Sequence, residues 1–111
     1  MTVIVIAAVA AFVLFVGAGG SRISGVGAHE LVAQGARLVD VRTTTEFSAG
    51  HVDGALNIPV QDLSKRLSEL GDVAKPIVVY CHSGTRSARA ARILESAGFT
   101  SVHDLGAMSR W

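Results

Sequence analysis

The feature that most constrains the fold is an apolar run that ends at the single cysteine of the chain and leads into a helical segment. Ile77 to Tyr80 is apolar and precedes Cys81, and Ser87 to Ala97 is rich in alanine and arginine. This order predicts a buried strand, a tight loop and a helix whose amino terminus faces the cysteine. A helix amino terminus and the N–H groups of such a loop present partial positive charge, which favours a thiolate.

Segments with strand and helix character alternate along the chain. The expected strands are residues 37–42, 55–58, 77–80 and 100–104. The expected helices are residues 28–34, 62–70 and 87–97, the second from the i, i+4, i+7 spacing of its leucines. Alternation of this kind predicts an α/β fold, a small parallel sheet flanked by helices on both faces. Ligands of such sheets bind beyond the carboxyl ends of the strands, where the cysteine lies.

The first 20 residues differ from the rest because they contain no charged side chain, and Val3 to Val16 is an unbroken apolar run. A helix of this length spans about 30 Å, the thickness of a bilayer's hydrocarbon core. We therefore expect residues 1–20 to be a single-pass transmembrane anchor. A cleaved secretory signal is the alternative, and it is less favoured because no Lys or Arg precedes the apolar run.

The anchor would be followed by a polar connector over residues 21–27, and the globular domain would span residues 23–111. Arg22 lies just after the apolar run. Positive charge next to a span favours the cytoplasmic side, and a free thiol suits a reducing compartment. The sequence thus slightly favours a membrane protein whose globular part faces the cytoplasm.

Charge and cysteine content exclude several function classes. The formal net charge is +1, from 10 Lys and Arg against 9 Asp and Glu. A nucleic-acid footprint needs clustered basic residues, so we expect no nucleic-acid partner. One cysteine excludes an intramolecular disulfide and a cysteine-rich metal site. The four histidines are scattered without metal-ligand spacing, so we expect no metal and no cofactor.

The loop after the cysteine combines a nucleophile with an anion-binding environment. Arg86 closes the loop, and Arg89 and Arg92 follow at intervals of three residues, near one helix face. Basic side chains and a nest of N–H groups should lower the pKa of the Cys81 thiol and bind an oxyanion. The candidate anion-binding residues are Arg86, His82, Ser83, Gly84, Thr85 and Ser87.

The segment after the first expected strand has the form of a helix capping box. Thr43 would cap the helix, and Glu46 lies three residues further on. Glu46 is also an expected ion-pair partner of Arg42.

Residues 81–87 resemble the active-site loop of the rhodanese-like sulfurtransferases. Other segments match that family in order: residues 40–42, 46–47, 50–59 and 105–106, and Trp111. The resemblance covers residues 23–111 and implies a single α/β rhodanese-like domain. One departure is Ala107, which stands where the family often has a second glycine.

The resemblance implies a sulfurtransferase of the thiosulfate type with Cys81 as the catalytic residue. Cys81 would take the outer sulfur of thiosulfate or of a persulfide donor, and then pass it to cyanide or a thiol acceptor. Arg86 would orient the anion, and the N–H groups of residues 82–86 would stabilise the persulfide. Asp40, Arg42 and Glu46 would support the site without touching substrate.

Two alternatives remain at this point. Phosphatases and arsenate reductases with a related domain use a longer loop than the six residues from Cys81 to Arg86. A membrane-tethered persulfide carrier or interaction module without turnover is the other alternative. Retention of both Cys81 and Arg86 argues against a degenerate module.

Overall fold

A computed structural model of the chain describes residues 22–111, and its centre is a sheet of four parallel strands. The sheet order is β2-β1-β3-β4, with β1 (Arg37–Asp40), β2 (Leu56–Asn57), β3 (Ile77–Cys81) and β4 (Val102–Ala107). Strand β3 lies between β1 and β4, and all five of its residues are buried. The predicted small parallel sheet is confirmed.

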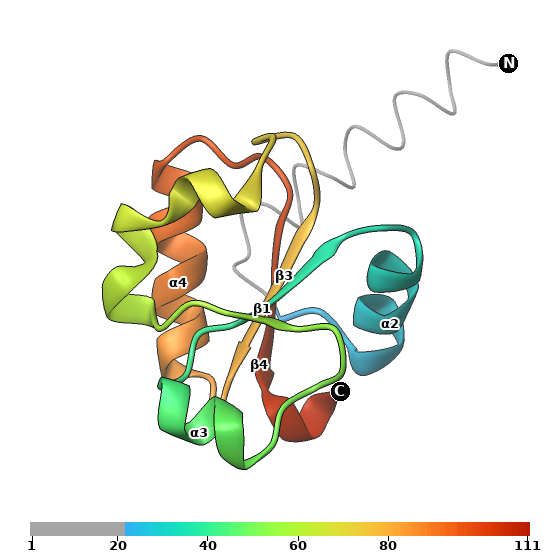
Figure 1. Ribbon diagram of the computed structural model, residues 1–111. Helices are drawn as coiled ribbons and strands as arrows, with labels where there is room; N and C mark the ends of the chain where they lie inside the picture. Colours follow the sequence, from blue (N-terminus) through green and yellow to red (C-terminus); the bar gives the residue numbers. More distant parts are fainter. Residues whose placement is uncertain (1–21) are drawn as a thin grey trace, which may run out of the picture.

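Helical segments cover both faces of the sheet, as Figure 1 shows with α4 and α2 on opposite sides. One face packs against α4 (Thr85–Ser96) and the 3-10 segments η1 (Val60–Lys65) and η2 (Leu67–Leu70). The other packs against α2 (Gly25–Ala33) and the short η3 (Met108–Arg110). Helix α3 (Thr44–Ala49) follows β1 directly at the carboxyl edge of the sheet.

The alternation of side chains along β3 decides which way the cysteine points. Ile77, Val79 and Cys81 belong to the core cluster on the α4 face, whereas Val78 and Tyr80 belong to the cluster on the α2 face. Successive side chains of a strand point to opposite faces. The sulfur of Cys81 therefore faces the layer that contains α4, the helix that follows it in sequence.

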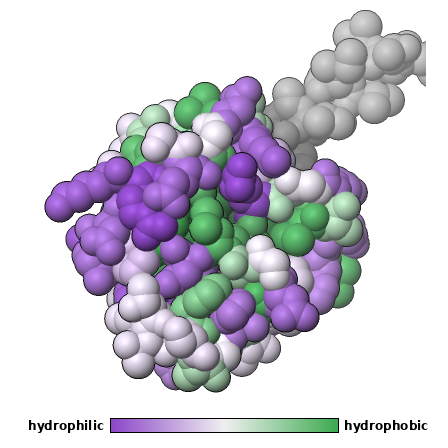
Figure 2. Space-filling view, in the orientation of Figure 1, coloured by the Kyte–Doolittle hydropathy of each residue, from purple (hydrophilic) through white to green (hydrophobic). Residues whose placement is uncertain are grey.

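Hydrophilic residues dominate the surface view of Figure 2, around a smaller apolar hollow. Among the described residues, the large apolar side chains that are exposed are Val26, at 71%, and Val73, at 45%. Isolated residues of this kind are normal on a protein surface and mark no interface by themselves.

The prediction of one amphipathic helix over residues 62–70 is wrong. The chain forms η1 and η2, and Arg66 between them has φ −121° and ψ 20°. Val60 and Leu63, and then Leu67 and Leu70, are each three residues apart. Side chains at i and i+3 eclipse one another in a 3-10 helix, so this spacing directs both apolar pairs to the core.

Two element boundaries also differ from expectation. Helix α2 begins at Gly25, where Ser24 accepts a hydrogen bond from the Gly27 N–H at 3.0 Å, so the connector expected over residues 21–27 is partly helical. Strand β4 continues past residue 104, because a bulge shifts its register and Gly106 pairs with Tyr80. Gly106 has φ +89°, a conformation that glycine adopts without strain.

The expected transmembrane anchor over residues 1–20 lies outside the described residues. Within residues 22–111, none of the helices has the length and apolar character needed to cross a bilayer.

Candidate active site

Cys81 ends β3 and is fully buried at the start of the loop that leads to α4. Its Sγ accepts a hydrogen bond from the Gly84 N–H at 3.0 Å. Gly84 has φ +105° and ψ −14°, in the left-handed region. A side chain would strain this conformation, so glycine allows the loop to turn its N–H groups back toward the sulfur.

The amino terminus of α4 stabilises a thiolate at this position. The first N–H groups of a helix have no partner within the helix, and Gly84 gives α4 no side-chain cap. Burial acts to raise the pKa of Cys81, but hydrogen bonds from the Ser87 hydroxyl and from the N–H groups of Ser87, Gly84 and Arg86 outweigh it. The net effect lowers the pKa of the thiol, as the loop sequence predicts.

Ser87 is a buried polar residue beside the cysteine. Its hydroxyl donates to the Gly84 carbonyl at 3.1 Å and is also within reach of the Cys81 sulfur. A hydroxyl carries one hydrogen, so it can serve only one of these acceptors at a time. Rotation of the hydroxyl toward sulfur when the thiol ionises would stabilise the charged form.

Arg86 forms an ion pair with Glu46 and does not point freely into the site. The Arg86 Nη1 lies 2.7 Å from Glu46 Oε1, and Nη2 lies 3.0 Å from Oε2. Glu46 also completes the predicted capping box with Thr43, which is confirmed. The expected ion pair between Glu46 and Arg42 is wrong, because Arg42 is buried against a different carboxylate.

That carboxylate belongs to Asp40, the last residue of β1. Asp40 and Arg42 are 0% and 4% exposed, and Arg42 Nη2 lies 2.8 Å from Asp40 Oδ2. The same guanidinium donates to the Gly50 carbonyl at 2.7 Å and lies over the Tyr80 ring. The hydrogen bond to Asp40 raises the pKa of Arg42 against the effect of burial. This pair fixes the loops that follow β1 next to β3.

The remaining predicted loop residues form the rim. The side chains of His82, Ser83 and Thr85 are exposed, and Gly84 is buried. The structure therefore brings the backbone of residues 84–87 together around Cys81, while these three side chains face outward.

A hollow of about 560 Å³ lies between the loop of residues 50–53 and η3. Its lining comprises Gly50, His51, Val52, Asp53, Met108 and Trp111. Ala107 of β4 pairs in register with Cys81, so η3 starts next to the cysteine. In Figure 1, α3, η3 and the start of α4 gather at the same end of the sheet. No residue of the Cys81 loop lines this hollow, and its Val52, Met108 and Trp111 pack on the α2 face of the sheet, whereas the Cys81 sulfur faces α4.

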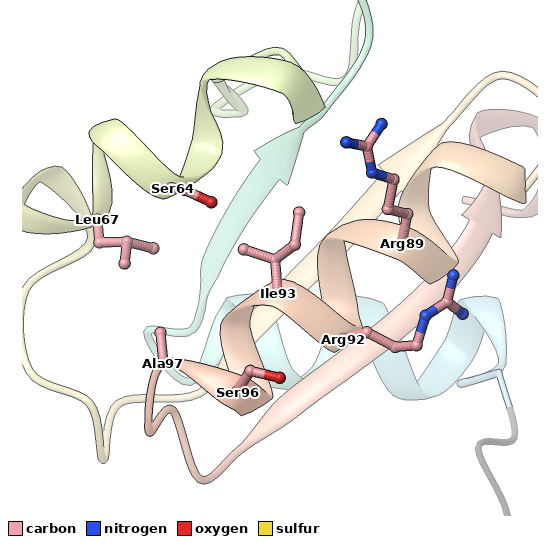
Figure 3. A pocket seen from close by; sticks show the side chains of 7 residues that line it. All are labelled: Ser64, Leu67, Arg89, Arg92, Ile93, Ser96 and Ala97. Carbon is pink, nitrogen blue, oxygen red and sulfur yellow. The ribbon is translucent and has the colours of Figure 1, made fainter.

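Arg89 and Arg92 lie away from the loop. Both are exposed on α4 and line a groove of about 430 Å³ between α4 and the 3-10 segments. Figure 3 shows Leu67 and Ile93 at this groove, with Arg89 and Arg92 carried on α4. No residue of the Cys81 loop lines this groove. These two arginines are therefore not part of the candidate site.

One contact to the loop comes from a residue that sequence reasoning did not assign to the site. Arg22 Nη2 donates to the Gly84 carbonyl at 3.3 Å. The only sequence signal was a basic residue at the start of the globular part, and nothing in a motif links it to a loop 62 residues away.

Comparison with known proteins identifies the domain. The model of the family described as the rhodanese-like domain matches residues 26–111. The chain belongs to the rhodanese-like domain family. Thiosulfate sulfurtransferase 16, chloroplastic, of Arabidopsis thaliana is 41% identical over 103 residues, which cover 82% of this chain and 86% of that protein. Thiosulfate sulfurtransferase GlpE of Shewanella oneidensis is 36% identical over 80 residues, covering 71% and 78%.

The fold of this chain agrees with that of solved rhodanese-like proteins. The human single-domain sulfurtransferase TSTD1 superposes with a TM-score of 0.70 at 28% identity, covering 81% of this chain and 90% of that one. The rhodanese-like domain described here therefore holds its cysteine loop on the same architecture as a named sulfurtransferase.

Proposed function

We propose that this protein transfers a sulfane sulfur from thiosulfate or a persulfide donor to a thiophilic acceptor through a persulfide on Cys81. The protein is an enzyme of the thiosulfate sulfurtransferase type, as its relatives of 36% and 41% identity are named. The observation that carries the Cys81 assignment is the sulfur at the amino terminus of α4, 3.0 Å from the Gly84 N–H, with the pKa of its thiol lowered.

In the first half-reaction the Cys81 thiolate attacks the outer sulfur of thiosulfate. A new S–S bond forms between Cys81 and that sulfur, the original S–S bond breaks, and sulfite leaves with the electron pair. The persulfide keeps one negative charge on its terminal sulfur. The N–H groups of the loop, which already face Sγ, can stabilise that charge.

In the second half-reaction the acceptor attacks the outer sulfur of the persulfide. A thiolate acceptor becomes a persulfide and cyanide becomes thiocyanate, while Cys81 leaves as the thiolate. The features that lower the pKa of Cys81 also make it a good leaving group here.

An assay with thiosulfate and cyanide tests the proposed chemistry against the phosphatase alternative. Wild-type protein should produce sulfite and thiocyanate and should leave a phosphate ester intact. Hydrolysis of the phosphate ester without any sulfur transfer would contradict the proposal.

The carrier alternative predicts a different stoichiometry. A carrier would release about one sulfite per Cys81 from thiosulfate and then stop, even with acceptor present, whereas an enzyme turns over repeatedly. The proposal of turnover is wrong if sulfite release stays at one equivalent with excess cyanide or thiol.

We also propose that residues 1–20 anchor the domain to a membrane, which would place sulfur transfer at the membrane surface. Their uncharged, apolar composition supports this proposal. The full-length protein should remain with membranes after a carbonate wash. Release of a shortened protein into the supernatant would instead favour a cleaved signal.

A further inference from the structure

We infer that Arg22 is a positioning residue for sulfur transfer. Its guanidinium binds the Gly84 carbonyl and adds positive charge next to the loop that surrounds Cys81. Arg22 does this from outside the segment that the family model matches. The inference rests on the proposed function of Cys81. The family segment starts at residue 26, so Arg22 belongs to the stretch that joins the apolar leader to the domain.

The contacts connect Arg22 to the loop and to the neighbouring strand. Its Nη2 lies 3.3 Å from the Gly84 carbonyl oxygen, and its Nε lies 3.9 Å from Asp104 Oδ2 on β4. The backbone holds this segment in place, because the Ile23 N–H donates to the Asp104 carbonyl at 2.8 Å. The Arg22 side chain is 46% exposed, so its attachment comes from this two-sided contact rather than from burial.

Two glycines make room for the guanidinium. A Cβ atom on Gly106 would lie 2.7 Å from Arg22 Nε, well inside van der Waals contact. A Cβ atom on Gly84 would overlap Nη2. Gly106 also donates its N–H to Asp104 Oδ1 at 2.8 Å, which turns this carboxylate toward the arginine. The loop glycine and the bulge glycine of β4 therefore form a cradle that Arg22 occupies.

The Gly84 carbonyl connects Arg22 to the chemistry. Its peptide group also contains the Thr85 N–H, the first N–H of α4. This carbonyl accepts from the Arg22 guanidinium, from the Ser87 hydroxyl and from the Ala88 N–H. A positive charge on a carbonyl polarises its peptide group and makes the N–H a stronger donor. The N–H donors to the Cys81 sulfur are the neighbouring groups of Gly84, Arg86 and Ser87, so Arg22 acts by adding positive charge to the same helix end that surrounds the thiolate.

The charged groups around the loop define how large this effect can be. Arg86 and Glu46 are paired with each other, and Asp104 offsets part of the Arg22 charge. Arg22 is therefore a source of positive charge at the loop beyond the Arg86–Glu46 pair. Because Arg22 is half-exposed, we expect its removal to change the alkylation rate of Cys81 and the KM for thiosulfate by roughly two- to five-fold, the range of an exposed charged contact.

The test compares full-length Arg22→Ala, Arg22→Lys and wild-type proteins. Since Cys81 is the only cysteine, the pH dependence of alkylation by iodoacetamide reports the pKa of this thiol alone. Arg22→Ala should raise the pKa, slow alkylation at pH 7 by roughly two- to five-fold, and raise KM for thiosulfate by a similar factor. Arg22→Lys keeps the charge and should restore most of the difference.

Arg37→Ala is the matched control. Arg37 also donates to a backbone carbonyl, that of Leu70 at 3.1 Å, but it lies at the opposite end of β1 from the site. This variant should alkylate like the wild type. The inference is overturned if Arg22→Ala titrates like the wild type, or if Arg37→Ala shifts the titration equally. Failure of the wild type to transfer sulfur would refute the proposed function, whereas the alkylation comparison would still decide the role of Arg22.

Discussion

Arg86 of α4 and Glu46 of α3 form a two-point ion pair, with N–O distances of 2.7 and 3.0 Å, across the mouth of the cysteine loop. The pair ties the loop after β3 to the helix after β1. Hydrogen bonds from Arg86, and then from the Thr43 N–H, lower the pKa of Glu46 from 4.5 to about 2. An incoming anion must therefore compete with the Glu46 carboxylate for the Arg86 guanidinium.

The lowered pKa of Glu46 predicts a pH-dependent contribution to stability. A carboxylate with a depressed pKa stabilises the fold above its unfolded value of about 4.5, and that contribution is lost as the pH falls toward 2. Each side chain is 34% exposed, so we expect only about 0.5–1 kcal/mol. The free energy of unfolding of Glu46→Gln should thus be lower than that of the wild type at pH 6, and the difference should shrink as the pH falls through the folded pKa of about 2. A gap that widens in acid would contradict this assignment.

Removing Arg86 should weaken anion binding, whereas removing the charge of Glu46 should strengthen it. Arg86→Ala removes positive charge from the loop, so KM for thiosulfate should rise by roughly ten-fold. Glu46→Gln can keep the capping box and frees the guanidinium, so KM should fall by about two- to five-fold. Steady-state kinetics with thiosulfate and cyanide measure both. A higher KM in Glu46→Gln would mean that the carboxylate holds Arg86 in its working position.

Ser87→Ala tests the buried hydroxyl beside the sulfur. Loss of this donor should raise the pKa of Cys81 and slow its alkylation at pH 7 by roughly ten-fold, the scale of a hydrogen bond to a charged group. Ser83→Ala serves as the control because Ser83 is an exposed serine of the same loop. Equal alkylation rates in the two variants would show that the hydroxyl serves the Gly84 carbonyl alone.

Asp40→Asn should be the most destabilising of these substitutions. It removes the charge that balances Arg42 and leaves an uncompensated guanidinium that is 4% exposed. Breaking a buried pair from one side costs about 3–5 kcal/mol, which urea unfolding would measure. Glu69→Gln is the control: it breaks an exposed pair with Arg66 and should leave the urea midpoint unchanged. A similar midpoint in Asp40→Asn and the wild type would refute a structural role for the pair.

The strand, loop and helix around Cys81 could be predicted because local signals agree there. A run of buried apolar residues, a glycine that must take positive φ and an alanine-rich helix all lie within residues 77–97. The capping box at Thr43 is equally local, since its two partners are three residues apart. Signals of this range do not depend on how the chain folds back on itself.

Pairings across the fold could not be predicted in the same way. Glu46 is four residues from Arg42 and 40 from Arg86, and sequence distance favours the wrong partner. The buried Asp40–Arg42 pair leaves Glu46 free for α4, which only the tertiary arrangement reveals. For the same reason the contact of Arg22 with Gly84 has no signature in sequence, and neither has the bulge that carries β4 past Asp104.

The central claim is that Cys81 carries the transferred sulfur, and the mass of the full-length protein after exposure to thiosulfate tests it most directly. Wild-type protein, freed of excess donor, should gain the mass of one sulfur atom. Peptide mapping should place the added sulfur on Cys81, and cyanide or a thiol acceptor should remove it. Cys81→Ser should fold normally and gain nothing. Wild-type protein that turns over thiosulfate without ever carrying the added sulfur, or a Cys81→Ser protein that still transfers sulfur, would contradict the mechanism.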